Sequence, residues 1–445
     1  MNSILVRNLG PIGEIFIDLL PNFFAIIGAQ ASGKSTLAKI IYFCKKIRDY
    51  AVEFVGEDDV FYVSSSANDE ECYVSFLRKL RDRFMKIFDT TEYSCEDFYV
   101  KYIFNGTDFV ELTLGETKYV DFQFSQEIEA KLKKLFNVVR QFNVEEHENT
   151  QNEIEIRKFW QEQLARKRKL DWVSSIFSDS GEEILYIPAG RGIFSILATQ
   201  FNAIDNLNFD LPVKDFIEKV RIAKSRFGKN LTQVVEDYSQ TCEIPVKKHD
   251  INLAKDLIKL ILKADYINDT DGEKLYIDSK HCINLIYGSS GQQEVLWILL
   301  MMFSLIMEHK KAFIILEEPE ANVYPDAQKD IVKLVALTLS STQSQIFITT
   351  HSPYILTSAN LLIHSGRVEN HISALDKEIV IPQQFRMNPK DSVAYKLSKA
   401  DNRYKLENIC DSESGMFNAS EIDKISNIIL EDTDKLIDLE LKYGL

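Results

Sequence analysis

The sequence predicts an α/β protein, in which a parallel sheet with a glycine-rich loop lies beside an antiparallel β-subdomain and helical insertions. An apolar run at residues 23–27 leads into Gly28, and a helical period follows over residues 33–48. Between residues 294 and 353, short buried runs alternate with helical segments, as in a parallel sheet covered on both faces. Between residues 98 and 124, turn signals at Asn105-Gly106 and Gly115 separate β-rich runs typical of antiparallel strands.

The chain of 445 residues is longer than the roughly 250–300 residues that one core supports, so several parts are expected. Long charged stretches almost free of Gly and Pro indicate helical segments after residue 125 and again over residues 213–263, before a hairpin at Asp271-Gly272. The predicted parts are an N-terminal half with the glycine-rich loop and the antiparallel strands (1–124), a helical insertion (125–182), a strand with a helical lobe and hairpin (183–284), a C-terminal half with the alternating buried runs and helices (285–370) and a C-terminal extension (371–445).

Composition excludes several classes of protein. Hydrophobic residues make up 45% and charged residues 27% of the chain, which excludes collagen-like and wholly disordered proteins. A net charge of −15 argues against a uniformly basic nucleic-acid surface but permits a local basic groove. The six cysteines form no C-x-x-C pair, and the apolar stretch Val295–Met307 is too short to span a membrane. Without a signal-like N-terminus, the expected location is the cytoplasm, with no membrane partner.

The first motif with chemical meaning is G-x-x-x-x-G-K-S, which lies between the predicted strand and helix in the context of a P-loop. Backbone N–H groups of such a loop wrap phosphates at the helix N-terminus. Lys34 is expected to reach the outer phosphates of ATP and the Ser35 hydroxyl to ligate Mg²⁺. The residues predicted to bind the nucleotide are Gly28, Ala29, Gln30, Ala31, Ser32, Gly33, Lys34, Ser35 and Thr36.

An acidic segment, Glu317-Glu318-Pro319-Glu320, follows the apolar run 312–316. It places carboxylates at the carboxyl end of a buried strand, where ligands bind in open α/β sheets. Carboxylates at the end of a buried strand are costly unless a cation or a water uses them. Glu317 is expected to hold Mg²⁺, and Glu318 to position or deprotonate the attacking water. A solvated acidic loop is the alternative interpretation.

Two further polar segments flank this region. Residues 289–293 (Ser-Ser-Gly-Gln-Gln) precede the apolar helix predicted from Glu294 and are typical either of an anion-binding helix start or of a simple N-cap. His351 follows another buried run, where its imidazole is placed to contact a γ-phosphate or a water. A lone histidine there is more often structural.

The order of these four motifs resembles the ATPase head of the ABC class found in RecF, SMC and overcoming-lysogenization-defect (OLD) proteins. The resemblance implies that Ser290 and Gly291, with Gln292 beside them, contact the nucleotide as the signature. It further implies Glu318 as the catalytic glutamate, with Lys34 and His351, the switch histidine, as the other catalytic residues.

Three more segments carry the same resemblance. Residues 7–12 are similar to the opening hairpin of these ATPases, and residues 317–325 to their extended second Walker motif. Residues 186–191 (Tyr-Ile-Pro-Ala-Gly-Arg) resemble a segment of the OLD-like ATPases in bacterial anti-phage systems such as Septu and PARIS. Together these segments cover the head, about two thirds of the chain.

The sequence departs from that family at three points. Glu317 stands where most ABC heads have Asp, and Tyr324 stands where the family usually has His. The glutamine of the Q-loop is not fixed by the pattern, with Gln123 and Gln126 as the candidates.

The resemblance has consequences for partners. In heads of this class, the signature of one head closes on the nucleotide held by another, and this chain has one copy of each motif. ATP hydrolysis is therefore expected to require self-association, most simply as a two-fold dimer. The insertion at 125–182 is then a lever or a docking arm. Its basic cluster at 166–169 is either a solvated helix face or a contact to a nucleic-acid backbone.

OLD proteins join this head to a C-terminal nuclease, and Asp432-Thr433-Asp434 has the spacing of its metal-binding aspartates. The apolar residues around it follow a helical period, so nuclease activity in this chain is not expected. The resemblance implies a regulatory ATPase of anti-phage defence that senses a phage-derived trigger and controls a separately encoded effector, a nuclease or a toxin. The alternatives are a RecF- or SMC-like DNA-binding repair ATPase, and a scaffold that binds ATP and hardly hydrolyses it.

Overall fold

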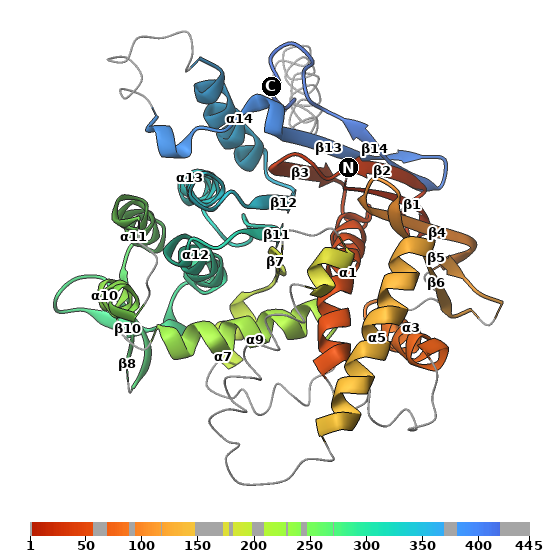
Figure 1. Cartoon of the computed structure of the whole chain (residues 1–445). Coiled ribbons are helices and arrows are strands. Elements are labelled where there is room, and N and C mark those ends of the chain that lie inside the picture. The colour runs from red at the N-terminus through yellow and green to blue at the C-terminus, as the bar shows by residue number, and fades with distance from the viewer. Residues whose placement is uncertain are drawn as a thin grey trace, which may run out of the picture.

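The protein's structure, a computed structural model, is a mixed α/β fold (Figure 1). It describes residues 2–56, 69–88, 94–116, 118–146, 172–177, 181–197, 209–227, 230–241, 247–269, 271–368 and 381–418. The predicted basic cluster at 166–169 and the Asp432-Thr433-Asp434 motif lie outside these residues. The prediction of a parallel sheet beside an antiparallel β-subdomain is confirmed.

The central sheet has six strands in the order β14-β13-β3-β12-β11-β7. The strands are β3 (Phe23–Gly28), β7 (Glu183–Ile187), β11 (Ala312–Glu317), β12 (Gln345–Thr350), β13 (Ser392–Ala400) and β14 (Arg403–Asn408). Neighbouring strands are parallel except β13 and β14, which are antiparallel. The middle strands β3, β12 and β11 are apolar along nearly their whole length because both faces of the sheet are covered.

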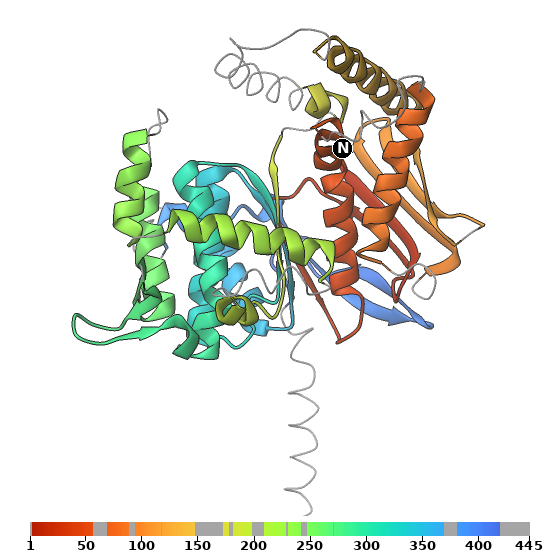
Figure 2. The same cartoon turned by 90° about the horizontal axis from the view of Figure 1, so that it is seen from below.

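Alternate residues of these strands enter two different cores. Ile314 and Leu316 of β11 pack in one core with the helices α11 (Lys248–Leu262), α12 (Ser290–Glu308), α13 (Pro325–Thr342) and α14 (Pro353–Val368). Phe313 and Ile315 pack in the other with α1 (Lys34–Gly56) and the antiparallel sheet. Figure 2 shows these two groups of elements on opposite sides of the central sheet.

The apolar helix α12 lies in the first of these cores. Among the described residues it is the one helix long and apolar enough to cross a membrane by length and composition. Its side chains are instead largely covered by the fold, since 72% of the apolar window is buried.

The antiparallel β-subdomain has five strands in the order β2-β1-β4-β5-β6. They are β1 (Ser3–Leu9), β2 (Glu14–Asp18), β4 (Ser94–Asn105), β5 (Asp108–Leu114) and β6 (Val120–Phe124). The predicted hairpin at Asn105-Gly106 joins β4 to β5, with Gly106 at φ 56°. Helices α3 (Asp69–Met85) and α5 (Gln126–Glu146) pack against this sheet. Of the predicted insertion at 125–182, the described part consists of α5, residues 172–177 and the two residues before β7.

The helical lobe after β7 contains α7 (Gly192–Leu197), α9 (Leu211–Arg226), α10 (Leu231–Thr241) and α11. It ends in a three-stranded sheet of β8 (Asp265–Asp269), β9 (Gly272–Tyr276) and β10 (Cys282–Asn284). The predicted hairpin forms here, with Gly272 at φ 107°, a backbone conformation that favours glycine.

The segment predicted as a C-terminal extension from residue 371 supplies two strands to the central sheet, so the boundary at 370 does not separate it from that sheet. Strand β13 pairs with β3, and Leu397 lies against Gly28 of the P-loop strand. Arg403 Nη1 donates to the carbonyls of Gly10 and Ile12, both at 3.1 Å. The sequence of β13, SVAYKLSKA, mixes polar and apolar residues and gives a weak strand signal.

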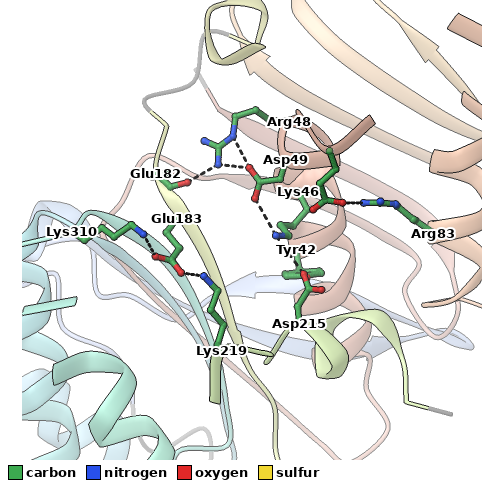
Figure 3. A network of polar contacts seen from close by, with 11 residues as sticks. Tyr42, Lys46, Arg48, Asp49, Arg83, Glu182, Glu183, Asp215, Lys219 and Lys310 are labelled. Atoms are coloured by element: carbon green, nitrogen blue, oxygen red, sulfur yellow. Dashed lines mark hydrogen bonds and ion pairs between the residues drawn. The ribbon is translucent and has the colours of Figure 1, made fainter. Parts of the chain in front are cut away.

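A network of ion pairs holds α1 against β7 and α9 (Figure 3). Lys46 of α1 lies 3.4 Å from the carboxylate of Asp215 in α9, which also accepts a hydrogen bond from Tyr42. Glu183 of β7 pairs with Lys219 of α9. The helix that begins with the P-loop lysine is therefore attached to the helical lobe.

Candidate functional site

The P-loop connects the end of β3 to the start of α1. Ala31 and Gly33 have φ of 59° and 99°, a backbone form that turns successive N–H groups into the loop and makes an anion-binding nest. A Cβ on Gly33 would lie 3.1 Å from side-chain atoms of both Pro11 and Ile12. Any other residue at position 33 would therefore strain the backbone and crowd Pro11 and Ile12.

The other predicted P-loop residues differ in burial. Ser32, Lys34 and Thr36 are buried, whereas Ala29, Gln30, Ala31 and Ser35 are exposed. The Ser32 hydroxyl is buried and finds no hydrogen-bond partner within the described part of the chain. Such a group lacks the partner that buried polar atoms require, and a phosphate oxygen would supply one. These features fit a nucleotide at this loop.

Lys34 points back into the loop and towards acidic residues. Its Nζ donates to the carbonyls of Gly28 and Ala29, both at 2.9 Å. Burial lowers the pKa of Lys34, and the carboxylates of Glu318, Glu320 and Glu317 act in the opposite direction. The fold thus brings the P-loop lysine and the acidic motif together, with an excess of negative charge that favours a bound cation.

Glu317 is the most buried of these acids, with 6% of its surface exposed. Its Oε2 accepts a hydrogen bond from Ala189 N at 3.4 Å, while Oε1 is buried and makes no hydrogen bond to any described residue. Burial and the nearby Glu317 carboxylate hold the pKa of Tyr186 well above its ordinary value. An unsatisfied carboxylate oxygen near Lys34 of the P-loop fits Mg²⁺, which takes one or two protein oxygens together with substrate phosphates.

Glu318 and His351 lie on the solvent-exposed side of the site. Glu318 Oε1 lies 3.6 Å from His351 Nε2, and the two side chains are 39% and 40% exposed. Glu320 fixes the His351 backbone, because its Oε1 accepts from His351 N at 2.6 Å and from Thr350 Oγ1 at 2.8 Å. Glu318 is therefore held where a water can reach it, as a general base requires.

ATP hydrolysis is expected to slow as the pH falls below the ordinary imidazole range. Burial and the charge of Lys34 lower the pKa of His351 from 6.5, so the ring is neutral at pH 7 and gains its proton only below pH 6.5. The imidazolium would pair with Glu318 and weaken it as a base. Initial rates from pH 5 to 8 check this, and His351→Gln is expected to remove the imidazole's contribution to the acidic limb. An identical limb in His351→Gln would contradict it.

Arg191 is a site residue for which no sequence pattern predicts a role. It is fully buried, and its guanidinium donates to the backbone carbonyls of Pro188, Glu294, Glu317 and Glu318. Burial lowers the pKa of Arg191 to about 10, which leaves it charged at neutral pH. A single arginine after a strand and a glycine carries no periodic signal. Only the fold shows that it lies behind the acidic motif.

The signature segment begins one turn earlier than expected. Helix α12 starts at Ser290 rather than at Glu294, and Ser289 is its N-cap. The Gln292 side chain completes a capping box with Ser289 and donates to Leu262 O at 2.8 Å, so its amide holds the helix start. Ser290 is exposed in the first turn. A nucleotide contact by Ser290 is compatible with this exposure, whereas the Gln292 side chain stabilises the start of the helix.

Gly291 lies against the loop that follows the acidic motif. A Cβ at this position would be 2.6 Å from the carbonyl oxygen of Asn322. Real Cβ atoms do not approach an oxygen so closely. Only a glycine at position 291 therefore allows the signature helix to pack directly against this loop. Asn322 itself has φ 57°.

Gly291→Ala is expected to lower kcat for ATP hydrolysis by about tenfold or more, since it must displace the loop that carries Glu318. The matched control is Gly106→Ala in the β4–β5 hairpin, where a Cβ meets nothing within 4 Å and the cost is backbone strain alone. The control should lose stability but keep wild-type kcat. Steady-state kinetics and thermal melting check both variants, and a Gly291→Ala protein with normal kcat would contradict the expectation.

The three departures from the family pattern are placed as follows. Tyr324 is the N-cap residue of α13 and is 73% exposed. Gln123 of β6 and Gln126 at the start of α5 are exposed on the β-subdomain. Their assignment to a Q-loop stays a prediction, as does the role of Glu317 at the metal position.

Among solved structures, the chain is similar to SMC heads. The Smc head bound to the C-terminal winged-helix domain of ScpA shares 12% identity at a TM-score of 0.45, with 93% of this chain and 98% of that chain covered. The SMC head domain from Thermotoga maritima shares 10% identity at a TM-score of 0.37, with 92% and 98% covered. The Smc head with an extended coiled coil, bound to the C-terminal domain of ScpA from Pyrococcus furiosus, shares 11% identity at 0.39, with 96% and 98% covered. No function follows from resemblances this distant.

No curated protein matches the sequence. The family model of the AAA ATPase domain matches residues 1–356, which is most of the chain of 445 residues. The matched residues include the P-loop, the acidic motif and His351, the same elements that the fold brings together. The chain therefore belongs to the family of the AAA ATPase domain.

Proposed function

We propose that the protein hydrolyses ATP with Mg²⁺, using Glu318 as the general base. The observation that carries this proposal is the position of the buried Lys34 near Glu317, Glu318 and Glu320, after the carboxyl ends of β3 and β11, the two strands that flank β12 in the sheet. Bound Mg²⁺ would neutralise charge on the phosphates and help orient them. Lys34 and the loop amides would bind the phosphates, and Ser35 and Glu317 would hold the metal. Glu318 would accept a proton from the attacking water.

Glu317→Gln is expected to raise the Mg²⁺ concentration needed for half-maximal hydrolysis by about tenfold, because it removes the charge of a buried metal ligand. Glu317→Asp is the matched control, since it keeps a carboxylate and should stay near the wild-type requirement. Phosphate release is measured against free Mg²⁺ at saturating ATP. Equal Mg²⁺ dependence in Glu317→Gln and wild type would contradict the assignment, and a wild-type protein that releases no phosphate would contradict the proposed function.

We further propose that hydrolysis uses the signature of a second copy. In support, the α12 start is exposed at Ser290, and two large side chains near it are exposed. Tyr287, three residues before Ser290, is 76% exposed, and Tyr324, next to the loop that meets Gly291, is 73% exposed. Tyrosine is a frequent interface residue. Lys34→Ala and Ser290→Arg should each be inactive alone. Their mixture should recover activity, because a mixed dimer joins an intact P-loop to an intact signature, and a mixture as inactive as its parts would contradict the dimer.

For the cellular role, we propose that the nucleotide state controls a separately encoded effector, a nuclease or toxin, in anti-phage defence. The support is the resemblance of residues 186–191 to OLD-like ATPases, strengthened by the contacts of Arg191 to the acidic motif. Co-expression with the neighbouring gene product should yield a complex whose amount differs between wild type, Lys34→Ala and Glu318→Gln. If the protein instead purifies alone and binds DNA in a salt-dependent manner, the RecF- or SMC-like alternative holds.

A further inference from the structure

We propose that Arg191 is a positioning residue for ATP hydrolysis that couples the signature helix to the catalytic loop. This inference rests on the proposed function and concerns a residue that touches neither the nucleotide nor the reacting water. Arg191 follows β7, at the edge of the central sheet, and joins its own loop to two segments far from it in the sequence, the first turn of α12 and the acidic motif.

The hydrogen bonds of the guanidinium all lead to backbone carbonyls. Nη1 donates to Pro188 O and to Glu317 O, each at 2.6 Å, and Nη2 donates to Glu318 O at 3.1 Å. Nε donates to Glu294 O at 3.1 Å. The side chain is 0% exposed, so water does not compete for these bonds.

The backbone conformation of Glu318 explains why these hydrogen bonds are needed. Its φ is 42°, in the left-handed region that non-glycine residues rarely adopt and that persists only where the surroundings enforce it. The Arg191 bond to the Glu318 carbonyl is one restraint, and the bond from Glu318 N to Thr349 O at 2.9 Å is another. Together they fix the direction in which the Glu318 side chain leaves the backbone.

The fourth acceptor supplies the coupling. Glu294 lies one turn after Ser290 in α12, and its carboxylate is 3.8 Å from Arg191 Nε. A shift of α12 therefore moves Arg191, and Arg191 moves the carbonyls of Glu317 and Glu318. The planar guanidinium presents several donors in one rigid fork, which a lysine cannot reproduce. A displacement of the exposed start of α12 thus changes the position of the general base, Glu318, through the Arg191 side chain.

The test compares Arg191→Lys with Arg48→Met, another buried arginine that pairs with Asp49 and the Glu182 carbonyl on the far part of α1. Arg191→Lys keeps a buried positive charge but loses most of the hydrogen bonds that the planar guanidinium donates. We expect ATP affinity within about twofold of wild type and kcat lower by about 10²-fold, since small displacements of a catalytic group have effects of this size. Arg48→Met should lose thermal stability but keep kcat.

A second readout does not depend on hydrolysis. Amide hydrogen exchange over residues 317–323 should rise in Arg191→Lys, because Ala321 N donates to the same Glu318 carbonyl that Arg191 holds. Glu294→Gln, a milder change, should fall between wild type and Arg191→Lys in both readouts. If the wild-type protein does not hydrolyse ATP but Arg191→Lys exchanges faster than wild type, the proposed function is refuted and the positioning role of Arg191 is supported. Unchanged exchange and unchanged kcat in Arg191→Lys would overturn the inference.

Discussion

Glu318→Gln is expected to bind ATP and Mg²⁺ as wild type does and to hydrolyse ATP about 10³-fold more slowly. The amide keeps the shape of the side chain and its place 3.6 Å from His351, but it cannot accept a proton from water. The neighbouring Glu317 is too buried to replace it. Fluorescent-nucleotide binding and phosphate release measure the two properties separately.

The control for that variant is Glu111→Gln, which removes a carboxylate that pairs with Lys101 at 2.8 Å in the β-subdomain. It should keep wild-type kcat. A Glu318→Gln protein that hydrolyses ATP at the wild-type rate would show that Glu318 is not the base, whereas one that no longer binds ATP would show that its carboxylate is needed for binding.

Lys34→Ala is expected to weaken ATP binding by about 3 kcal/mol, or about 10²-fold in Kd, because it leaves buried phosphate charge without its cation. It also leaves the loop carbonyls of Gly28 and Ala29 without the donor that bonds to them. Hydrolysis at cellular ATP concentrations should then be lost. Titration calorimetry with ATP and Mg²⁺ measures the affinity.

A suitable comparison for Lys34→Ala is Lys45→Met, on the same helix. Lys45 is as buried as Lys34, but it lies eleven residues further along α1, away from the phosphate loop, and pairs with Glu182 at 3.0 Å. Lys45→Met should lower the melting temperature and leave the ATP affinity unchanged. If the two variants weakened ATP binding equally, loss of α1 packing rather than loss of a phosphate contact would explain both results.

The sequence predicts the parts of the site that depend on local pattern. The P-loop has a fixed spacing between a strand and a helix, and β11 is a continuous apolar run that ends in acids, so each can be located from neighbouring residues alone. The same holds for the β4–β5 hairpin, where Asn105-Gly106 supplies the turn. Local chemistry decides these elements, and tertiary contacts do not alter them.

The remaining parts depend on contacts between distant segments. Strand β13 is mixed in polarity and belongs to the sheet because β3 offers it a partner edge. Arg191 gains its role from the carbonyls of Glu294 and Glu317, which are 103 and 126 residues away from it along the chain. The cap of α12 falls on Ser289 because Gln292 can reach back to it. In the sequence, the polar residues and glycine at 289–293 offer several possible starts for that helix.

The central claim is that Lys34, Glu317 and Glu318 form one site for hydrolysis of Mg²⁺-ATP. The structure of Glu318→Gln with ATP and Mg²⁺ tests it most directly. We expect the outer phosphates within hydrogen-bond distance of Lys34 Nζ, the metal near Ser35 Oγ and Glu317 Oε1, and Ser290 of a second copy at the γ-phosphate. A nucleotide bound elsewhere, with Lys34 still bonded to the carbonyls of Gly28 and Ala29, would contradict it.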